Sequence, residues 1–371
     1  MSGSKFADRV LNMNISGIRK MFEAAGSDAI NLGLGQPDFD TPQHIKQAAI
    51  DAINSGFTAY TAGPGIPELR EELSRKFKKE NSFAVDPSEI IITSGASEAL
   101  ELAIASLVNP GDEVMIANPG FVSYNALVNM MGGKVSNIPL DDELTIRPET
   151  IMERVNSKTK ALIINSPANP TGAVQSKKDM KAFAEIADDK NVTIISDEVY
   201  EHFIYEGEHV SPARFTDNVI TVNAVSKTYA MTGWRIGYVA AKKEYVEEML
   251  KVHQYVQACA NSIAQKAAFA AISGPQDSVT QMREEFLRRR NVLIDGLRSL
   301  GLKCVVPKGA FYAFPEVDDC TKVASDLIAN GLVVVPGTAF GEKGDGHIRI
   351  SYASSMPSIH KALEIMEKVL T

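Results

Sequence analysis

The sequence predicts an α/β fold, a three-layer α/β/α arrangement around a mainly parallel sheet, with a smaller α+β domain. From about Thr41 helical patterns alternate with short β-branched runs, as in a sheet covered by helices. Most of these runs are continuous Val, Ile, Ala and Leu, which is expected of strands buried on both faces. Beyond Lys243 come two long helical stretches and then shorter mixed elements. We therefore expect a large domain at 41–274 and a discontinuous small domain at 1–40 and 275–371.

The predicted elements follow one another in a regular order. Thr41 is a suitable N-cap for the first helix, Pro42 fits the first helical position because no donor is needed there, and Gly56 ends the helix. Residues 66–73 continue in helical period. A further helix is predicted over 98–108. The predicted strands are residues 90–93, 113–117, 161–165, 192–196, 219–223 and 236–240.

The charge balance excludes one class of partner. The chain has 371 residues with 38 Lys and Arg against 46 Asp and Glu, a formal net charge of −8. Nucleic-acid binding requires a basic face, so we expect no nucleic-acid partner. Residues 288–290 are consecutive arginines, but Glu284 and Glu285 lie beside them in a helical stretch, which predicts a solvated face.

Cysteine, histidine and apolar patterns exclude further classes. Cys259, Cys304 and Cys320 are widely spaced without a CxxC pair, which predicts a reduced, cytoplasmic protein. The N-terminus is charged where an export signal is apolar, and no run approaches the roughly 20 apolar residues of a membrane span, so we expect neither export nor a membrane partner. The histidines form no i,i+4 pair that would present two ligands on one helix face, so no metal site is predicted.

Polar and small residues follow several predicted strands, where ligands of such sheets bind. Ser94-Gly95-Ala96-Ser97 lies between a strand and a helix, and backbone donors at such a helix start can hold a phosphate. An ordinary tight turn is the alternative. The segment lacks the further glycine and the lysine of nucleotide-binding loops, so a phosphate group smaller than a dinucleotide is the better fit.

Three later segments add charged candidates. Residues 165–172 form a turn rich in Pro and Gly after a strand, which turn chemistry alone could explain. Asp197 ends the next strand, and burying its carboxylate requires a cation or donors, although it could also cap the following helix. Lys227 precedes Arg235 by a short segment with the only Trp, which favours a cationic anion site. A desolvated lysine is also the usual nucleophile toward carbonyl groups.

Together these segments resemble the pyridoxal-phosphate aminotransferases of fold type I. The resemblance rests on Lys227 in Ser-Lys-Thr-Tyr-Ala-Met-Thr-Gly-Trp-Arg, on Asn169-Pro-Thr-Gly, on Asp197-Glu-Val-Tyr200, and on Arg349 in His-Ile-Arg-Ile-Ser-Tyr. It extends in the right order from Ile15 to the C-terminus and is greatest for the prokaryotic class I aspartate or aromatic enzymes. It implies pyridoxal 5'-phosphate as cofactor and a ping-pong transfer of an amino group from an L-amino acid to 2-oxoglutarate.

The resemblance also implies roles for individual residues. Lys227 matches the Schiff-base lysine, and Asp197 matches the partner of the pyridinium nitrogen, which lets the ring accept electron density. Asn169 and Tyr200 match the residues that hydrogen-bond the ring phenolate, and Phe121 matches the stacking aromatic residue. The phosphate would be held by Gly95, Ala96, Ser97, Ser226 and Arg235.

For the substrate, Arg349 matches the arginine that binds the α-carboxylate, helped by Gly35 and Asn169. Tyr60 matches a tyrosine that reaches the phosphate of the neighbouring subunit, which implies a homodimer. Ala224 stands where many relatives have a phosphate-binding Ser, so Ser226 or a water molecule is expected to replace that contact.

Side-chain specificity stays open. Some relatives that prefer acidic substrates have a Lys near the position of Ser97, and this chain does not. The resemblance places part of the side-chain pocket on loops, on residues 15–19 and on the partner subunit. Aspartate and aromatic substrates therefore both remain.

Other activities remain as alternatives. A pyridoxal-phosphate lyase of the C–S β-lyase type would use the same scaffold. A cofactor-sensing regulator is disfavoured, because such proteins carry an additional DNA-binding segment, whereas here the match begins near the first residue at a net charge of −8. A hydride-transferring dehydrogenase is disfavoured because no complete GxGxxG follows a strand.

Overall fold

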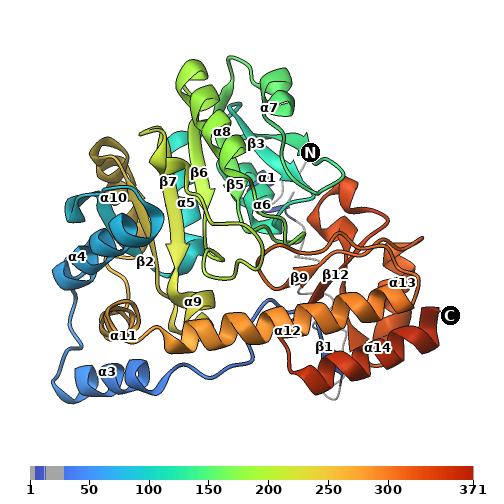
Figure 1. Cartoon of the computed structure of the whole chain (residues 1–371). Helices are drawn as coiled ribbons and strands as arrows, with labels where there is room; N and C mark the ends of the chain where they lie inside the picture. The colour runs from blue at the N-terminus through green and yellow to red at the C-terminus, as the bar shows by residue number, and fades with distance from the viewer. Residues whose placement is uncertain (1–4, 12, 14–28, 371) are drawn as a thin grey trace.

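The computed structural model describes residues 5–11, 13 and 29–370, and its centre is a seven-stranded sheet (Figure 1). The strand order is β2-β8-β7-β6-β5-β3-β4, and β8 alone runs in the opposite direction to the other six strands. The strands are β2 (Ile90–Thr93), β3 (Glu113–Asn118), β4 (Lys134–Pro139), β5 (Thr159–Asn165), β6 (Thr193–Asp197), β7 (Val219–Ala224) and β8 (Gly237–Ala241). The mainly parallel sheet is thus confirmed.

Helices cover both faces of this sheet, which confirms the three-layer α/β/α architecture. On one face lie α5 (Gly95–Leu107), α6 (Val122–Met130) and α10 (Lys243–Val256). On the other lie α4 (Pro67–Lys76), α7 (Pro148–Arg154), α8 (Lys177–Lys190) and α11 (Ser262–Ser273), and α3 (Gln43–Asn54) packs against α11. Side chains of β5 alternate between the two layers, with Ile163 in the first and Leu162 and Ile164 in the second, so both faces of the strand are apolar.

The start of the first large-domain helix differs from the prediction. Pro42 is the N-cap residue of α3, and no side chain caps the helix. The hydroxyl of Thr41 donates instead to the carbonyl of Ala230 at 2.8 Å, so this residue links the helix to the turn after Lys227. Gly56, with φ of 76°, follows the last residues of α3 as predicted.

The C-terminal part packs around a second core. Its helices are α12 (Asp277–Ser299), α13 (Cys320–Ala329) and α14 (Met356–Leu370), and Figure 1 shows α12 running from below the central sheet to this part. Its small sheets are β11-β12-β9, formed by Val335–Pro336, Ile348–Ser351 and Tyr312–Ala313, and the parallel pair of β1 (Ile30–Asn31) with β10 (Leu332–Val333). The segment before Thr41 thus contacts the C-terminal part, while the exact domain boundary stays a prediction.

The predicted solvated face at 288–290 is wrong for two of the three arginines. Arg288 pairs with Glu285 on the surface, as expected. Arg289 and Arg290 are buried, at 5% and 8% exposure. Arg289 binds Asp38, and Arg290 binds Glu206 and the carbonyl of Pro307. These arginines are therefore structural links between segments far apart in the sequence.

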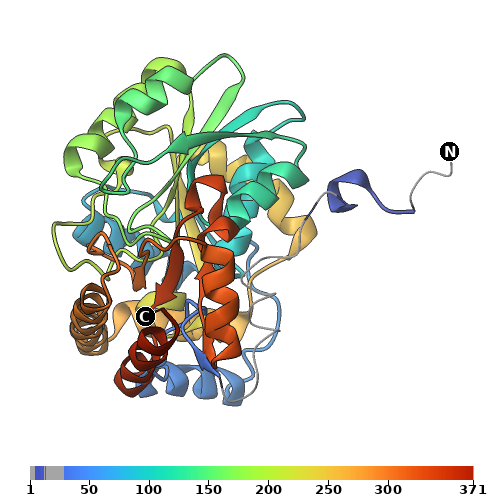
Figure 2. The same ribbon diagram turned by 90° about the vertical axis from the view of Figure 1, so that its right-hand side faces the viewer.

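The remaining short elements complete the description. Turns of 3-10 or π type lie at Phe77–Asn81, Pro87–Glu89, Pro212–Arg214, Thr232–Trp234, Gly337–Phe340 and Glu342–Gly344, and α9 is the short helix Val225–Thr228. Figure 2 shows α1 (Asp8–Leu11) beside the body of the molecule, and the nearby side chains of Phe6, Val10 and Leu11 are exposed. No helix in the described part of the chain combines the length and the apolar character needed to cross a bilayer.

Candidate active site

A cavity of about 540 Å³ lies at the carboxyl ends of β5, β6 and β7. Parallel strands place their carboxyl ends at one edge of the sheet, so residues distant in sequence meet there. Tyr312 and Arg349 close the cavity from the C-terminal part. Of the residues predicted from the sequence, the cavity is lined by Gly35, Ala96, Ser97, Phe121, Asn169, Asp197, Tyr200, Ser226, Lys227, Arg235 and Arg349.

One end of the cavity is suited to an anion. Gly95 begins α5 with φ of 79°, and a Cβ atom there would lie 2.4 Å from Nη2 of Arg235, so only glycine lets the guanidinium approach. Arg235 donates to the carbonyl of Thr232 at 3.1 Å, which fixes its side chain beside the helix start. Free N–H groups of the first helical turn and a guanidinium together favour a phosphate.

Asp197 lies at the floor of the cavity with 4% exposure. The hydroxyl of Tyr124 donates to its Oδ2 at 2.7 Å, and the N–H of Val199 donates to its Oδ1 at 3.3 Å. Burial raises the pKa of Asp197 to about 6, although both donors oppose this rise. A cationic group placed against this carboxylate would therefore be strongly favoured.

Lys227 projects into the same cavity from α9. Its Nζ donates to the carbonyl of Gly35 at 2.7 Å and lies 6.0 Å from the centre of the Tyr200 ring. Desolvation lowers the pKa of Lys227 to about 8, and the charges of Arg349 and Arg235 lower it as well. The amine can therefore become a neutral nucleophile close to physiological pH.

Arg349 is 1% exposed and lies on β12. Its Nη1 donates to Oδ1 of Asn169 at 2.9 Å, and its Nη2 donates to the carbonyl of Gly33. The guanidinium lies against the rings of Tyr312 and Phe340, at 4.7 and 4.8 Å. Its Nε is buried and has no hydrogen-bond partner among the residues that the structure describes. Such a held guanidinium is suited to a planar anion such as a carboxylate.

Two tyrosines of the site were not predicted. Tyr124 binds Asp197, and Tyr312 shares a 2.8 Å hydrogen bond with Tyr200. Tyr312 also leaves no room for a side chain at position 35, because a Cβ atom on Gly35 would lie 1.9 Å from the hydroxyl of Tyr312. Tyr124 follows β3 at the same sheet edge and could have been found by that rule, whereas nothing in the sequence around Tyr312 marks it.

Two further predictions fall outside this cavity. Gly95 does not line it but contacts Arg235, which does. Tyr60 is 89% exposed and does not line the cavity of its own chain. The predicted contribution of residues 15–19 to the side-chain pocket lies outside the described residues. Ala224 and Ser226 both line the cavity, so the phosphate contact expected of Ser226 stays a prediction.

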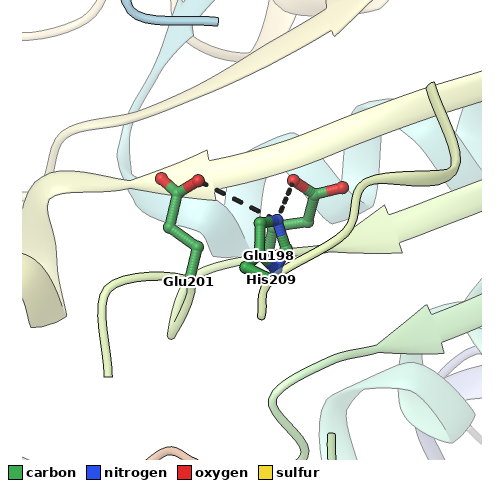
Figure 3. Close-up of side chains that lie close together, drawn as sticks. All are labelled: Glu198, Glu201 and His209. Carbon is green, nitrogen blue, oxygen red and sulfur yellow. Dashed lines mark hydrogen bonds and ion pairs between the residues drawn. The ribbon is translucent and has the colours of Figure 1, made fainter. Parts of the chain in front are cut away.

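A charged cluster lies just after β6, the strand that ends at Asp197 (Figure 3). Glu198 and His209 lie 2.9 Å apart, His209 and Glu201 lie 4.0 Å apart, and the three could together offer ligands to a metal. The spacing of the histidines along the chain gave no sign of this group, because its residues are brought together by the loop after β6 and not by one helix face. Its carboxylates already have protein donors, which are Lys76, Asn81 and Asn223 for Glu201, and Ser196 and Ser211 for Glu198.

This cluster is best described as an ion-pair network. Burial opposes a charge on His209, but the charge of Glu198 raises the pKa of His209 above its ordinary value. Burial likewise opposes ionisation of Glu201, yet Lys76 holds the pKa of that carboxyl well below its usual range. That no metal binds here stays a prediction from the sequence. The contacts of Glu198 and Glu201 with protein donors support it.

Comparison with known proteins gives consistent relatives. The family model for aminotransferase class I and II matches residues 27–365. A probable aspartate aminotransferase of Methanocaldococcus jannaschii is 49% identical over 98% of this chain and 99% of its own length. An aromatic-amino-acid aminotransferase of Thermococcus litoralis is 42% identical over 98% of both chains.

The fold agrees with these sequence matches. The solved structure of an aspartate aminotransferase from Thermus thermophilus with maleate superposes with a TM-score of 0.96 at 40% identity, covering 99% of this chain and 100% of that one. Sequence and fold thus agree along almost the whole chain. The chain belongs to the class I and II aminotransferase family.

Proposed function

We propose that this protein is a pyridoxal-phosphate-dependent aminotransferase that moves the amino group between an L-amino acid, aspartate or aromatic, and 2-oxoglutarate by a ping-pong mechanism. The observation that carries the proposal is the meeting of three groups in one cavity. Lys227 is a lysine of lowered pKa, Asp197 is a buried carboxylate, and Arg349 is a held guanidinium. Each group suits one part of the cofactor or substrate.

The described residues fit the cofactor. The start of α5, with Gly95, Ala96 and Ser97, together with Arg235 and Ser226, offers donors for its phosphate. Asp197 would pair with the ring nitrogen, and Asn169, Tyr200 and Phe121 surround the space between these two ends. When bound, the cofactor supplies an electron sink for a carbanion at the substrate α-carbon.

The protein supplies orientation and proton transfer. Arg349 would hold the substrate α-carboxylate, because its guanidinium lines the cavity and is fixed by Asn169 and the carbonyl of Gly33. Lys227 would act as general base at the α-carbon, because a pKa of about 8 leaves roughly a tenth of the amine neutral at pH 7. Its bond to the carbonyl of Gly35 keeps Nζ on the substrate side of the cavity.

The substrate side chain is less restricted by the described residues. Apolar Leu34, Leu100 and Val122 and polar Ser97 and Ser123 all line the cavity. Curated relatives of the chain include both an aspartate and an aromatic-amino-acid aminotransferase. We therefore propose both substrate classes and let experiment decide between them.

We also propose that the active form is a homodimer in which Tyr60 reaches the phosphate of the neighbouring site. This proposal is supported by Tyr60, which is 89% exposed and does not line the cavity of its own chain. Tyr255 and Val256, at the end of α10, are also exposed, at 87% and 54%. Exposed aromatic and aliphatic groups of this size are typical of a protein interface.

The test is rapid mixing of the purified holoenzyme with aspartate, glutamate, tyrosine, phenylalanine or alanine, without a keto acid. Absorbance of the bound cofactor should change in a single turnover, and 2-oxoglutarate should restore it. The control is Lys227→Ala, which should lack turnover with every amino acid. For the lyase alternative the enzyme is mixed with an S-substituted cysteine, whose thiolate can leave from the β-carbon, and release of ammonia and pyruvate without 2-oxoglutarate would indicate the lyase. Normal transamination by the control would refute the role of Lys227.

A further inference from the structure

His253 is a fully buried histidine outside the cavity. It lies on α10 with 0% exposure, and its two ring nitrogens have different partners. Nδ1 lies 2.7 Å from Oε1 of Glu98, and Nε2 lies 2.9 Å from the carbonyl oxygen of Gly63. The function proposed above uses neither His253 nor Glu98.

The hydrogen-bond partners define how the two side chains are linked. The carbonyl of Gly63 can only accept, so Nε2 of His253 donates to it. Nδ1 shares a hydrogen bond with Oε1 of Glu98, and the other oxygen of Glu98 accepts the backbone N–H of Ser94. His253 and Glu98 therefore form a buried hydrogen-bonded pair that contacts two further segments of the chain.

One of these segments is the candidate phosphate site. Ser94 directly precedes Gly95, where α5 begins, and Glu98 lies in the first turn of that helix. The bond from the Ser94 N–H to Glu98 therefore sets the conformation of the turn that presents backbone donors to the cavity. A shift of Glu98 would move this turn, because the pair has no solvent that could replace the lost partner.

The other segment is the loop 57–65, which carries Tyr60. Gly63 lies three residues after Tyr60, and its carbonyl is held by His253. The same loop is held by Gln265, whose Nε2 donates to Oγ1 of Thr61 at 3.0 Å. The loop is thus fixed from α10 and α11, while the ring of Tyr60 stays exposed.

We propose that His253 and Glu98 are a positioning pair that couples the two cofactor sites of the dimer. Through Glu98 the pair holds the phosphate turn of its own site, and through Gly63 it holds the loop whose Tyr60 serves the neighbouring site. Cofactor retention in one subunit should therefore depend on His253 of both subunits. This inference rests on the proposed function and its dimer.

The test measures release of pyridoxal 5'-phosphate from the holoenzyme, followed by absorbance with a carbonyl reagent as trap. His253→Gln and Glu98→Ala should each speed release about tenfold or more, the size expected when a buried hydrogen-bonding group loses its partner. The double variant should be no worse than either single variant, because the two residues act as one unit. Glu98→Ala serves if His253→Gln does not fold. Glu98→Gln is the conservative variant and should release cofactor nearly as slowly as wild type, because its amide can accept from Ser94 and donate to Nδ1 of a neutral His253.

A matched control separates positioning from stability. Arg290→Gln removes another buried charge, which pairs with the half-exposed Glu206 and bonds the carbonyl of Pro307, and it touches neither loop. It should lower the melting temperature while leaving the release rate unchanged. Release rates of His253→Gln and Glu98→Ala that equal those of Arg290→Gln would overturn the inference.

A mixed dimer tests the coupling across the interface. One subunit carries Lys227→Ala with His253→Gln, and the other is wild type, so the cofactor bound through a lysine is in the wild-type subunit. Release from it should be faster than in a mixed dimer whose variant subunit carries Lys227→Ala alone. Equal rates would refute the coupling. A wild-type protein that binds no cofactor would instead refute the proposed function, and with it this inference.

Discussion

Replacing Asp197 with Asn should change how the stability of the cofactor-free protein depends on pH. The carboxyl is 4% exposed, and its pKa in the folded chain is about 6, against 3.8 as the ordinary value. Between these values the folded state keeps a proton that the unfolded state loses. The contribution of Asp197 to the free energy of unfolding therefore falls as pH rises from about 4 to about 6, and it stays low at higher pH.

The size of this effect follows from the two pKa values. Their difference corresponds to about 3 kcal/mol over the full range, at 1.36 kcal/mol per tenfold change in the proton equilibrium. About 2 kcal/mol of it falls between pH 4.5 and 7.5. For a chain of 371 residues this corresponds to a change of roughly 2 to 3 °C in melting temperature.

The assay is thermal unfolding of wild type and Asp197→Asn at both pH values, without cofactor. The melting temperature of the variant minus that of wild type should be larger at the higher pH. Asp318→Asn, on the surface, is the control and should follow wild type. A difference that does not change with pH, or that changes in the opposite direction, would refute the reasoning. Bound cofactor should diminish it, because a cationic ring nitrogen favours the carboxylate.

Three further predictions concern the cavity. Without cofactor, acylation of Lys227 should become half-maximal near pH 8, measured by mass spectrometry, whereas a free lysine derivative in the same mixture should react only at higher pH. Arg349→Lys should lower kcat/KM about 100-fold in steady-state kinetics while cofactor absorbance persists, because an ammonium cannot replace the planar guanidinium. Tyr124→Phe should shift the pH dependence attributed to Asp197 upward, since the hydroxyl that lowers the pKa of this carboxyl is lost.

The strands that the sequence revealed are those buried on both faces. Continuous apolar runs predict such strands directly, and six of the seven strands of the sheet were found in this way. The strand missed is β4, at the sheet edge, where Lys134 and Asn137 are exposed. An edge strand with polar residues has no continuous apolar run, so its pairing with β3 becomes visible only in the fold.

The residues of the site that were hardest to predict from the sequence are those that hold other site residues in place. Lys227, Asp197 and Arg349 lie in motifs whose order the sequence displays, and all three line the cavity. Tyr124 and Tyr312 act by holding Asp197 and Tyr200, contacts that depend on tertiary packing across 73 and 112 residues of sequence. The pattern of residues within one segment cannot predict contacts between segments so far apart in the sequence.

The reversal of β8 explains why the cationic residues meet the phosphate turn. An antiparallel neighbour needs no crossover, so the chain leaves β7 at Ala224 and enters β8 at Gly237 on the same edge of the sheet. Gly237 also pairs with Thr93, the last residue of β2, just before the turn that begins α5. The connection that carries Lys227 and Arg235 must therefore lie over the ends of both strands.

This close approach requires a glycine. A Cβ atom at position 237 would lie 2.5 Å from the backbone nitrogen of Ala96 and from the carbonyl carbon of Gly95. Any side chain would push the start of α5 away from Arg235 and open the anion site. The glycine of β8 thus sets the distance between two segments that a phosphate must contact together, although it does not itself line the cavity.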